Sequence, residues 1–356
     1  MACGMHLIRG YVDDDFKSCI GRTDMKAAEL DVVNLRVTFY PKGRKIQAVR
    51  GVNFSIKPNE RVGIVGESGC GKSQMARALI QLIPRYAGKI EEGKVIYDGV
   101  DLLTLGEKEM RRYRGREIGM IFQDARASLS PLICVGNQIV EAYMDHHPLA
   151  TKKEAKARAL ELLELVQIED PLRSFDQYPH ELSGGMCQRV MIALALAPDP
   201  KLLIADEPTT ALDVTIQSQI LDLLKRIQEQ LGMSILFITH DFSLLAGFCH
   251  RALVMYAGEI VEEASIKELF TNPKHPYTKA LLRSIPRLDL PKSAPLEVIE
   301  GNPPDLSKPI QGCPFQPRCK FRTSQCATSL PPMINRVACW LYDPRFKEKY
   351  ELFTSS

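Results

Sequence analysis

The stretch Gly66-Glu67-Ser68-Gly69-Cys70-Gly71-Lys72-Ser73 decides the fold of this chain. It matches the pattern G-x-x-x-x-G-K-[ST], and it stands between a short apolar run, residues 62–65, and a helix-forming run that starts at Gln74. Glycines let successive backbone N–H groups turn inward, and a helix N-terminus adds partial positive charge, so we expect the loop to hold a polyphosphate. Lys72 is expected to reach the outer phosphates, and the Ser73 hydroxyl to bind Mg²⁺.

Length and composition predict an ordinary globular protein. The 356 residues suggest about two domains, and the net charge of +3 implies no strong attraction to nucleic acid or to lipid. The longest apolar run, residues 190–197, is too short to cross a bilayer, and the acidic residues 13–15 argue against a signal peptide. We therefore expect a cytoplasmic chain that works alone or against a membrane partner.

The segments around the loop predict an α/β protein. Residues 32–40 and 48–56 are typical of strands that precede it, and residues 93–99 and 118–122 of strands that follow it. Tyr40 is a candidate to stack on an adenine ring, with a core or edge-strand aromatic as the alternative. Residues 126–185 predict a mainly helical insert, because Thr151 and Glu154 form a capping box ahead of an apolar stripe.

A second anion cradle is predicted at Ser183, Gly184 and Gly185. Ser183 is a good N-cap for the helix that follows, and the two glycines leave its first N–H groups open. This cradle would cover the exposed face of a triphosphate held by the first loop. A plain capped helix is the alternative.

Two acidic residues follow a strand that we expect to be buried on both faces. The apolar run 202–205 ends in Asp206 and Glu207, at the strand edge where open parallel sheets bind ligands. Asp206 suits Mg²⁺, and Glu207 suits the general base that polarises an attacking water. A third strand, residues 234–239, ends at His240, which would meet the terminal phosphate or that water.

The chain resembles the ATP-binding subunits of ABC transporters over residues 29 to about 265. The motifs that carry this resemblance follow one another in the order of that family: the phosphate loop (P-loop), Gln123, the run 182–188, Asp206-Glu207 and His240. The resemblance implies a P-loop ATPase core with a β lead-in subdomain, an inserted helical subdomain and a small Cys-rich C-terminal extension. It implies catalytic roles for Glu207, His240 and Gln123. It implies nucleotide contacts from residues 66–73, Gln74, Gln123, Asp206, Ser183, Gly184, Gly185, Gln188 and Tyr40, and Mg²⁺ contacts from Ser73, Gln123 and Asp206.

The C-terminal third resembles the corresponding subunits of oligopeptide and dipeptide importers, through residues 275–282 and 312–319. Beyond a Pro-rich stretch lie four cysteines with C-x5-C-x6-C-x12-C spacing, namely Cys313, Cys319, Cys326 and Cys339. A C-terminal tail this short usually needs disulfides or a bound metal to be stable. The wide spacing is compatible with a [4Fe–4S] cluster, which related subunits carry; zinc is the second choice, and unligated thiols or disulfides are the alternative.

These patterns divide the chain and suggest its partners. Residues 1–25 form an extension without an assigned function, residues 26–285 an ATPase domain, and residues 286–356 a linker with the Cys-rich domain. By resemblance, two ATPase subunits bind head to tail on the cytoplasmic face of the inner membrane, and the second is similar but not identical. They would serve two permeases and an extracytoplasmic peptide-binding protein. The alternatives are another cargo (nickel, an opine or an oligosaccharide) and a soluble ABC ATPase that acts on nucleic acid or ribosomes.

Overall fold

The structure is a computed structural model that describes residues 29–210, 212–285 and 298–355. The predicted N-terminal extension, Ala211 and residues 286–297 of the Pro-rich stretch (286–312) lie outside these ranges. Within them, no helix combines the length and the apolar character needed to cross a membrane.

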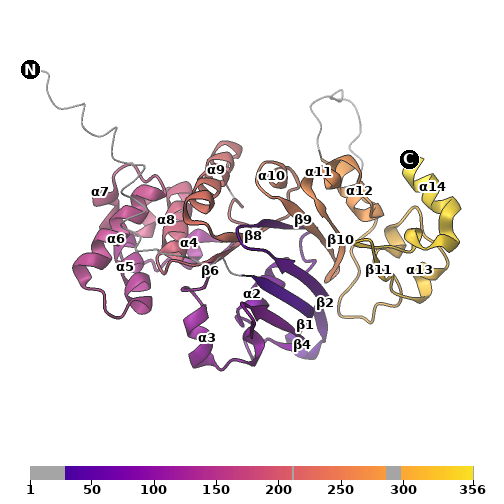
Figure 1. Ribbon diagram of the computed structural model, residues 1–356, viewed down its shortest axis with the longest axis horizontal. Coiled ribbons are helices and arrows are strands. Elements are labelled where there is room, and N and C mark those ends of the chain that lie inside the picture. Colours follow the sequence, from indigo (N-terminus) through magenta and orange to yellow (C-terminus); the bar gives the residue numbers. More distant parts are fainter. Residues whose placement is uncertain (1–28, 211, 286–297, 356) are drawn as a thin grey trace, which may run out of the picture.

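An eight-stranded sheet forms the centre of the molecule (Figure 1), with the strand order β11-β12-β10-β9-β3-β8-β7-β6. The strands β6, β7, β8, β3 and β9 run parallel, and β10, β12 and β11 add an antiparallel edge. The bounds are β3 (Arg61–Val65), β6 (Ile118–Ile121), β7 (Leu202–Asp206), β8 (Ser234–Thr239), β9 (Arg251–Tyr256), β10 (Glu259–Ser265), β11 (Met333–Ile334) and β12 (Val337–Ala338). Every residue of β3, β6, β7 and β8 is buried, which explains their nearly continuous apolar runs.

A second sheet is antiparallel and lies beside the first. Its order is β2-β1-β4-β5, with the bounds β1 (Leu30–Phe39), β2 (Ile46–Ile56), β4 (Gly88–Tyr97) and β5 (Val100–Asp101). Helix α2 (Lys72–Leu79) contacts both sheets, and its buried Met75 and Leu79 join one apolar cluster with Leu35 of β1 and Ile204 of β7. This packing attaches the phosphate loop, which precedes α2, to both sheets.

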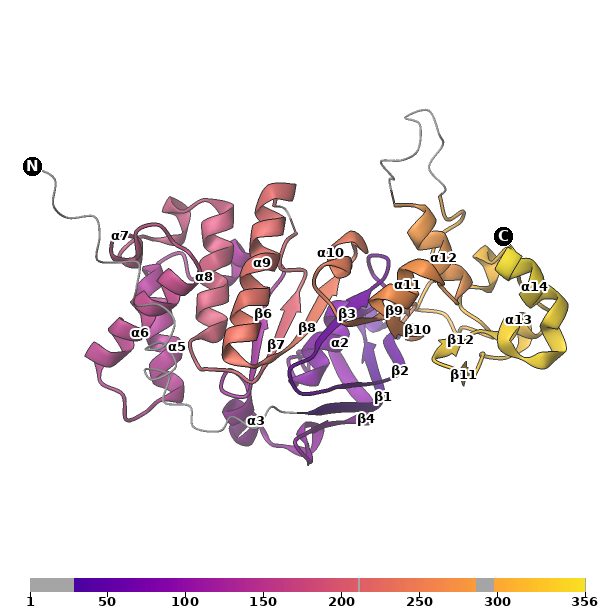
Figure 2. The same ribbon diagram turned by 45° about the horizontal axis from the view of Figure 1, so that its top comes forward.

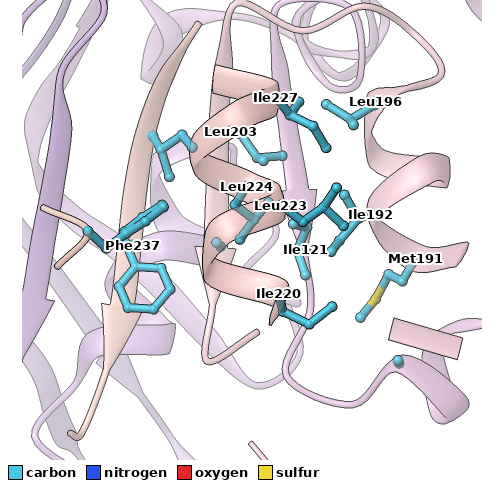
Figure 3. Packing of buried hydrophobic residues seen from close by; sticks show 14 of the residues in the cluster. Ile121, Met191, Ile192, Leu196, Leu203, Ile220, Leu223, Leu224, Ile227 and Phe237 are labelled. Carbon is cyan, nitrogen blue, oxygen red and sulfur yellow. The ribbon is translucent and has the colours of Figure 1, made fainter. Parts of the chain in front are cut away.

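Helices cover the other face of the central sheet and extend beyond its β6 end (Figure 2). Their bounds are α4 (Ala125–Ser128), α5 (Val135–His146), α6 (Lys152–Leu165), α7 (Pro171–Phe175), α8 (Gly184–Leu196) and α9 (Val214–Leu231). Helix α3 (Glu107–Tyr113) lies instead on the side of α2, where its Met110 joins the cluster of Met75 and Leu79. The apolar stripe of α9 packs against β7, β8 and α8 (Figure 3). The stripe comprises Ile220, Leu223, Leu224 and Ile227, and it meets Leu203, Phe237, Ile192 and Leu196.

The C-terminal region continues the central sheet at the opposite end of the molecule from α5, α6 and α7 (Figures 1 and 2). It is joined there by the antiparallel pairing of Glu262 in β10 with Val337 in β12. Its helices are α11 (Ile266–Thr271), α12 (Pro276–Arg283), α13 (Gln325–Thr328) and α14 (Lys347–Ser355), and the short α10 (Ser243–Ala246) precedes β9. A small apolar cluster of Val337, Cys339, Leu341 and Phe353 forms part of its interior.

Candidate functional site

The phosphate loop is shaped by backbone positions that only glycine fits. It connects β3 to α2, and Gly71, the residue before the helix, has a φ of +106°. A Cβ on Gly71 would lie 2.2 Å from the carbonyl oxygen of Ala48, and one on Gly66 would lie 2.1 Å from that of Met255. The loop therefore packs closely against β2 and the end of β9, with the N-terminus of α2 directed toward it.

Lys72 is folded back on the loop. Its Nζ donates hydrogen bonds to the carbonyl oxygens of Gly66 at 2.8 Å and Glu67 at 3.1 Å, and the residue is only 4% exposed. An ammonium held among carbonyls at the mouth of a helix N-terminus is placed to turn toward an anion.

The hydroxyl of Ser73 and the carboxylate of Asp206 lie side by side and together offer oxygen ligands for a divalent cation. The Ser73 hydroxyl donates to Asp206 Oδ1 at 2.8 Å, whereas Asp206 Oδ2, buried at the end of β7, has no hydrogen-bond partner in the described structure. Burial raises the pKa of this carboxyl above its usual range. An orphaned carboxylate oxygen beside a hydroxyl fits Mg²⁺, which binds hard oxygen ligands and would neutralise this buried charge.

Glu207 receives three polar groups on one oxygen. Its Oε2 accepts from Gln123 Nε2 at 3.0 Å and from Thr210 Oγ1 at 2.9 Å, and His240 Nδ1 lies 3.3 Å away. The residue has a φ of +48°, and its N–H donates to the carbonyl of Ile238 in β8. Gln123 thus contacts the carboxylate of Glu207 in this structure. Thr210, three residues after Glu207, is not among the site residues that the sequence predicts, and it joins the site here through its hydroxyl.

These groups converge because of the strand register. Ile121 pairs with Ala205, Asp206 with Ile238, and Val65 with Thr239, so the carboxyl ends of β6, β7, β8 and β3 meet at one edge. A hollow of about 1020 Å³ opens there. Its lining includes Tyr40, Ser68, Gly69, Gly71, Lys72, Ser73, Gln74, Gln123, Glu207, Thr210, His240 and Leu306.

Several predicted residues lie elsewhere. Glu67 is not in the lining of this hollow, and its carboxylate pairs with Arg318. Gly184 and Gln188 line a different hollow of about 810 Å³, which shares Arg77, Gln123 and Thr210 with the first and contains no residue of the phosphate loop. Ser183 caps α8 by accepting from the N–H of Met186, as its sequence position predicts. The phosphate loop and the second predicted cradle of one chain therefore line two adjoining hollows and do not meet in one.

The four C-terminal cysteines share one neighbourhood. Burial raises the pKa of Cys313 to about 12 and of Cys319 to about 11, and it also raises that of Cys339; the nearby thiols add to each rise. Yet across residues 29–210, 212–285 and 298–355 no group of three or more His, Cys, Asp or Glu is arranged to hold a metal ion. Cys326 Sγ instead lies 3.3 Å from the Thr323 hydroxyl. The donors have the chemistry of an iron–sulfur site without its geometry, so the structure does not support the expected cluster or zinc.

Comparisons with known proteins agree with this geometry. The family described as "ABC transporter" matches residues 49–210, and the family "Oligopeptide/dipeptide transporter, C-terminal region" matches residues 261–326. The dipeptide transport ATP-binding protein DppD of Bacillus subtilis is 48% identical over 321 residues, which cover 89% of this chain and 95% of that protein. The oligopeptide transport ATP-binding protein OppD of the same organism is 48% identical over 320 residues, with coverages of 88% and 89%.

A solved structure resembles the core of the fold. A dimeric, post-hydrolysis state of the ATP-binding cassette MJ0796 bound to ADP and Pi has a TM-score of 0.60 and 33% identity, and it covers 67% of this chain and 98% of that one. The chain is an α/β ABC ATPase with an additional C-terminal region, and it belongs to the ABC transporter ATP-binding proteins of the oligopeptide/dipeptide family.

Proposed function

We propose that this chain is the ATP-binding and ATP-hydrolysing subunit of an ABC importer that takes up di- and oligopeptides. The observation that carries the proposal is the meeting of Lys72, Ser73, Asp206 and Glu207 at one sheet edge. The family of the C-terminal region and the names of the relatives support the peptide cargo.

Each residue of the hollow has a proposed role in ATP hydrolysis that follows from its chemistry. The amides of the loop and Lys72 hold phosphate oxygens, and Tyr40 offers its ring to the adenine. Ser73 and Asp206 would hold Mg²⁺, with Gln123 as a further candidate ligand, and the ion would supply charge neutralisation at the phosphates. Glu207 takes a proton from the attacking water, and His240 orients that water or the terminal phosphate. Both Gln123 and His240 contact Glu207, so each is placed to tune this base.

We further propose that two ATPase subunits, similar but not identical, bind head to tail. Ser183, Gly184, Gly185 and Gln188 of one would then cover the nucleotide held by the phosphate loop of the other. This arrangement is supported by the separation of the two cradles on one chain. It predicts that ATP hydrolysis per chain rises with protein concentration, whereas strong turnover that is independent of concentration would contradict a half-site in each chain.

The remaining assembly follows from the family. Two membrane permeases would contact the groove at Gln123, an extracytoplasmic binding protein would deliver the peptide, and the chain would sit on the cytoplasmic face of the inner membrane without binding nucleic acid. Within the chain, we propose a nucleotide-binding domain over residues 26–285 with a helical subdomain near 126–185, followed by a Cys-rich domain in which Cys313, Cys319, Cys326 and Cys339 bind a structural [4Fe–4S] cluster. The last of these proposals rests on the chemistry of the four thiols and on their shared neighbourhood, and the sulfur atoms would have to move to hold the cluster, because the described residues show no arrangement that holds a metal ion.

Replacing the proposed base tests the function. Glu207→Gln keeps the shape of the side chain but removes its basicity, so ATP binding should persist while hydrolysis falls about 100-fold or more. Glu164→Gln, on the exposed face of α6, is the matched control and should hydrolyse ATP normally. Peptide-stimulated hydrolysis in the complex with permeases and binding protein tests the cargo. Full turnover in Glu207→Gln would remove Glu207 from the role of base, and stimulation by nickel, an opine or an oligosaccharide in place of peptide would reassign the cargo.

A further inference from the structure

The C-terminal region reaches back to the phosphate loop through Arg318. The guanidinium pairs with Glu67, the second residue of the loop, by two parallel contacts: Nη1 to Oε2 at 2.8 Å and Nη2 to Oε1 at 2.9 Å. The side chain of Arg318 is 4% exposed and that of Glu67 is 24% exposed. A two-pronged, mostly buried pair of this kind fixes the orientation of both partners as well as their distance.

Arg318 is itself held in place from the opposite side. Its Nε donates to the Glu300 carbonyl at 3.1 Å, its Nη2 to the Ile299 carbonyl at 3.2 Å, and its Nη1 to the Tyr256 hydroxyl at 3.3 Å. These partners come from the end of β9 and from the described part of the Pro-rich stretch. The guanidinium is therefore anchored before it meets Glu67, so that little side-chain freedom is lost in holding the loop.

The backbone of Glu67 is held by a second residue of the same region. The Glu67 N–H donates to the hydroxyl of Tyr277 in α12 at 2.9 Å, and Tyr277 is fully buried. Its ring packs at 4.5 Å from that of Tyr256 and 5.4 Å from that of Phe315, measured between centroids. The carbonyl of Glu67 accepts from Lys72 Nζ. Glu67 thus links the C-terminal region to Lys72, which lines the hollow.

A third contact reaches the hollow itself. Leu306, in the described part of the Pro-rich stretch, lines the hollow together with Tyr40 and Ile46. Its carbonyl accepts from the Gln47 N–H of β2 at 3.2 Å, so the segment is bonded to the strand that borders the site. The C-terminal region therefore touches the site at both its phosphate end and its Tyr40 end.

We propose that the C-terminal region is a structural part of the nucleotide site, in which Arg318 and Tyr277 are positioning residues that hold Glu67 and thereby set the shape of the phosphate loop. The inference rests on the proposed ATP binding and adds a regulator of affinity to it. A loop that binds phosphate by aligned amides loses affinity when its first turn is free to rotate, because the alignment must then be restored on binding. Loosening the C-terminal region should weaken nucleotide binding without touching the nucleotide.

The test is a double-mutant cycle on the full-length chain, with the dissociation constant of a fluorescent ATP analogue as its readout. Arg318→Gln and Glu67→Gln each break the pair, and each should raise the dissociation constant about tenfold. The dissociation constant of the double variant should be no higher than that of the single variant that binds less tightly, because the second change removes an interaction that is already lost. Arg345→Gln is the matched control: Arg345 makes a two-pronged pair with Asp343 in the same region, at 2.9 and 2.8 Å, away from the loop.

Thermal unfolding without nucleotide separates positioning from stability. A purely structural role would lower the melting temperature of Arg318→Gln and leave its affinity unchanged, which would overturn the proposal, as would additive effects in the cycle. Tyr277→Phe keeps the buried ring and removes only the acceptor for the Glu67 N–H; it should also weaken binding, and it carries the test if Arg318→Gln does not fold. If the unaltered chain binds no ATP analogue, the proposed function fails instead of this inference.

Discussion

Lowering the pH from 7 to 5 is expected to loosen α12, because His275 at its start is buried as the neutral imidazole. His275 is 1% exposed, its Nδ1 accepts from the Tyr277 N–H at 3.0 Å, and its own N–H donates to Glu262. Burial lowers the pKa of His275 from 6.5 to about 3, and the Ala338 carbonyl offsets only part of that shift. Protonation would remove the acceptor that caps the helix.

The sign and size of the effect follow from linkage. In the unfolded chain His275 binds a proton below about pH 6.5, whereas the folded chain does not until near pH 3, so folding stability falls as the pH drops through this window. At pH 5, about 1.5 units below the pKa of His275 in the unfolded chain, protonation stabilises the unfolded state by on the order of 2 kcal/mol relative to the folded state. For a domain of this size that corresponds to a fall in melting temperature of about 4–8 °C.

His275→Asn isolates this contribution, since asparagine caps a helix but does not take up a proton. The melting temperatures of both proteins are measured at pH 7 and pH 5, and the fall should be smaller in the variant by about 4–8 °C. Hydrogen exchange at the Tyr277 amide reports the same loosening locally, with faster exchange at pH 5 than the intrinsic rate change explains, in the unaltered chain only. Equal falls in the two proteins, with unchanged exchange at Tyr277, would refute the assignment of a neutral buried His275.

Two further predictions concern the ligands. Asp206→Asn should raise the melting temperature of the nucleotide-free chain, because burial raises the pKa of this carboxyl and its ionisation therefore opposes folding as the pH rises past that pKa. The same variant should lose the extra stabilisation by ATP with Mg²⁺ over ATP alone; scanning fluorimetry measures both, and a full Mg²⁺ effect would exclude Asp206 as a ligand. Protein purified without oxygen should contain about four iron and four acid-labile sulfide per chain, fewer in Cys326→Ser and the same number in Cys134→Ser. Zinc without sulfide would favour zinc, the second choice of metal. If the protein contained neither iron nor zinc, the cysteines would be unligated thiols.

Local signals in the sequence predicted the ends of the elements well. Thr151 accepts from the Glu154 N–H, and the Glu154 carboxylate accepts from the Thr151 N–H in return, as the capping box requires. The ends of α9 follow the same kind of local rule: the Asp213 carboxylate accepts from the Ile216 N–H at its start, and Gly232 ends it with a φ of +64°. These predictions succeed because the interacting groups are only a few residues apart, so that residue type and spacing are sufficient. The helix after the loop begins at Lys72, two residues before the expected Gln74, because the loop's own glycine already serves as its N-cap.

The candidate site was predictable as a set of residues, since the ends of parallel strands meet at one edge whatever their order. Its contacts were not. Which donors reach Glu207, and the fact that Thr210 is among them, depend on the register of β6, β7 and β8 and on the turn at Glu207. The spacing of the four cysteines likewise indicated a shared neighbourhood but not the arrangement of their sulfur atoms.

The sequence alone determined the phosphate loop, its flanking strand and helix, the acidic pair and the family, because each is encoded by neighbours along the chain. Only the tertiary structure decided that Arg318 meets Glu67 across 251 residues of sequence, and that Leu306 borders the hollow. No local pattern at Arg318 specifies which carboxylate it meets. That choice follows from the pairing of β10 with β12, which returns the C-terminal region to the sheet beside the phosphate loop.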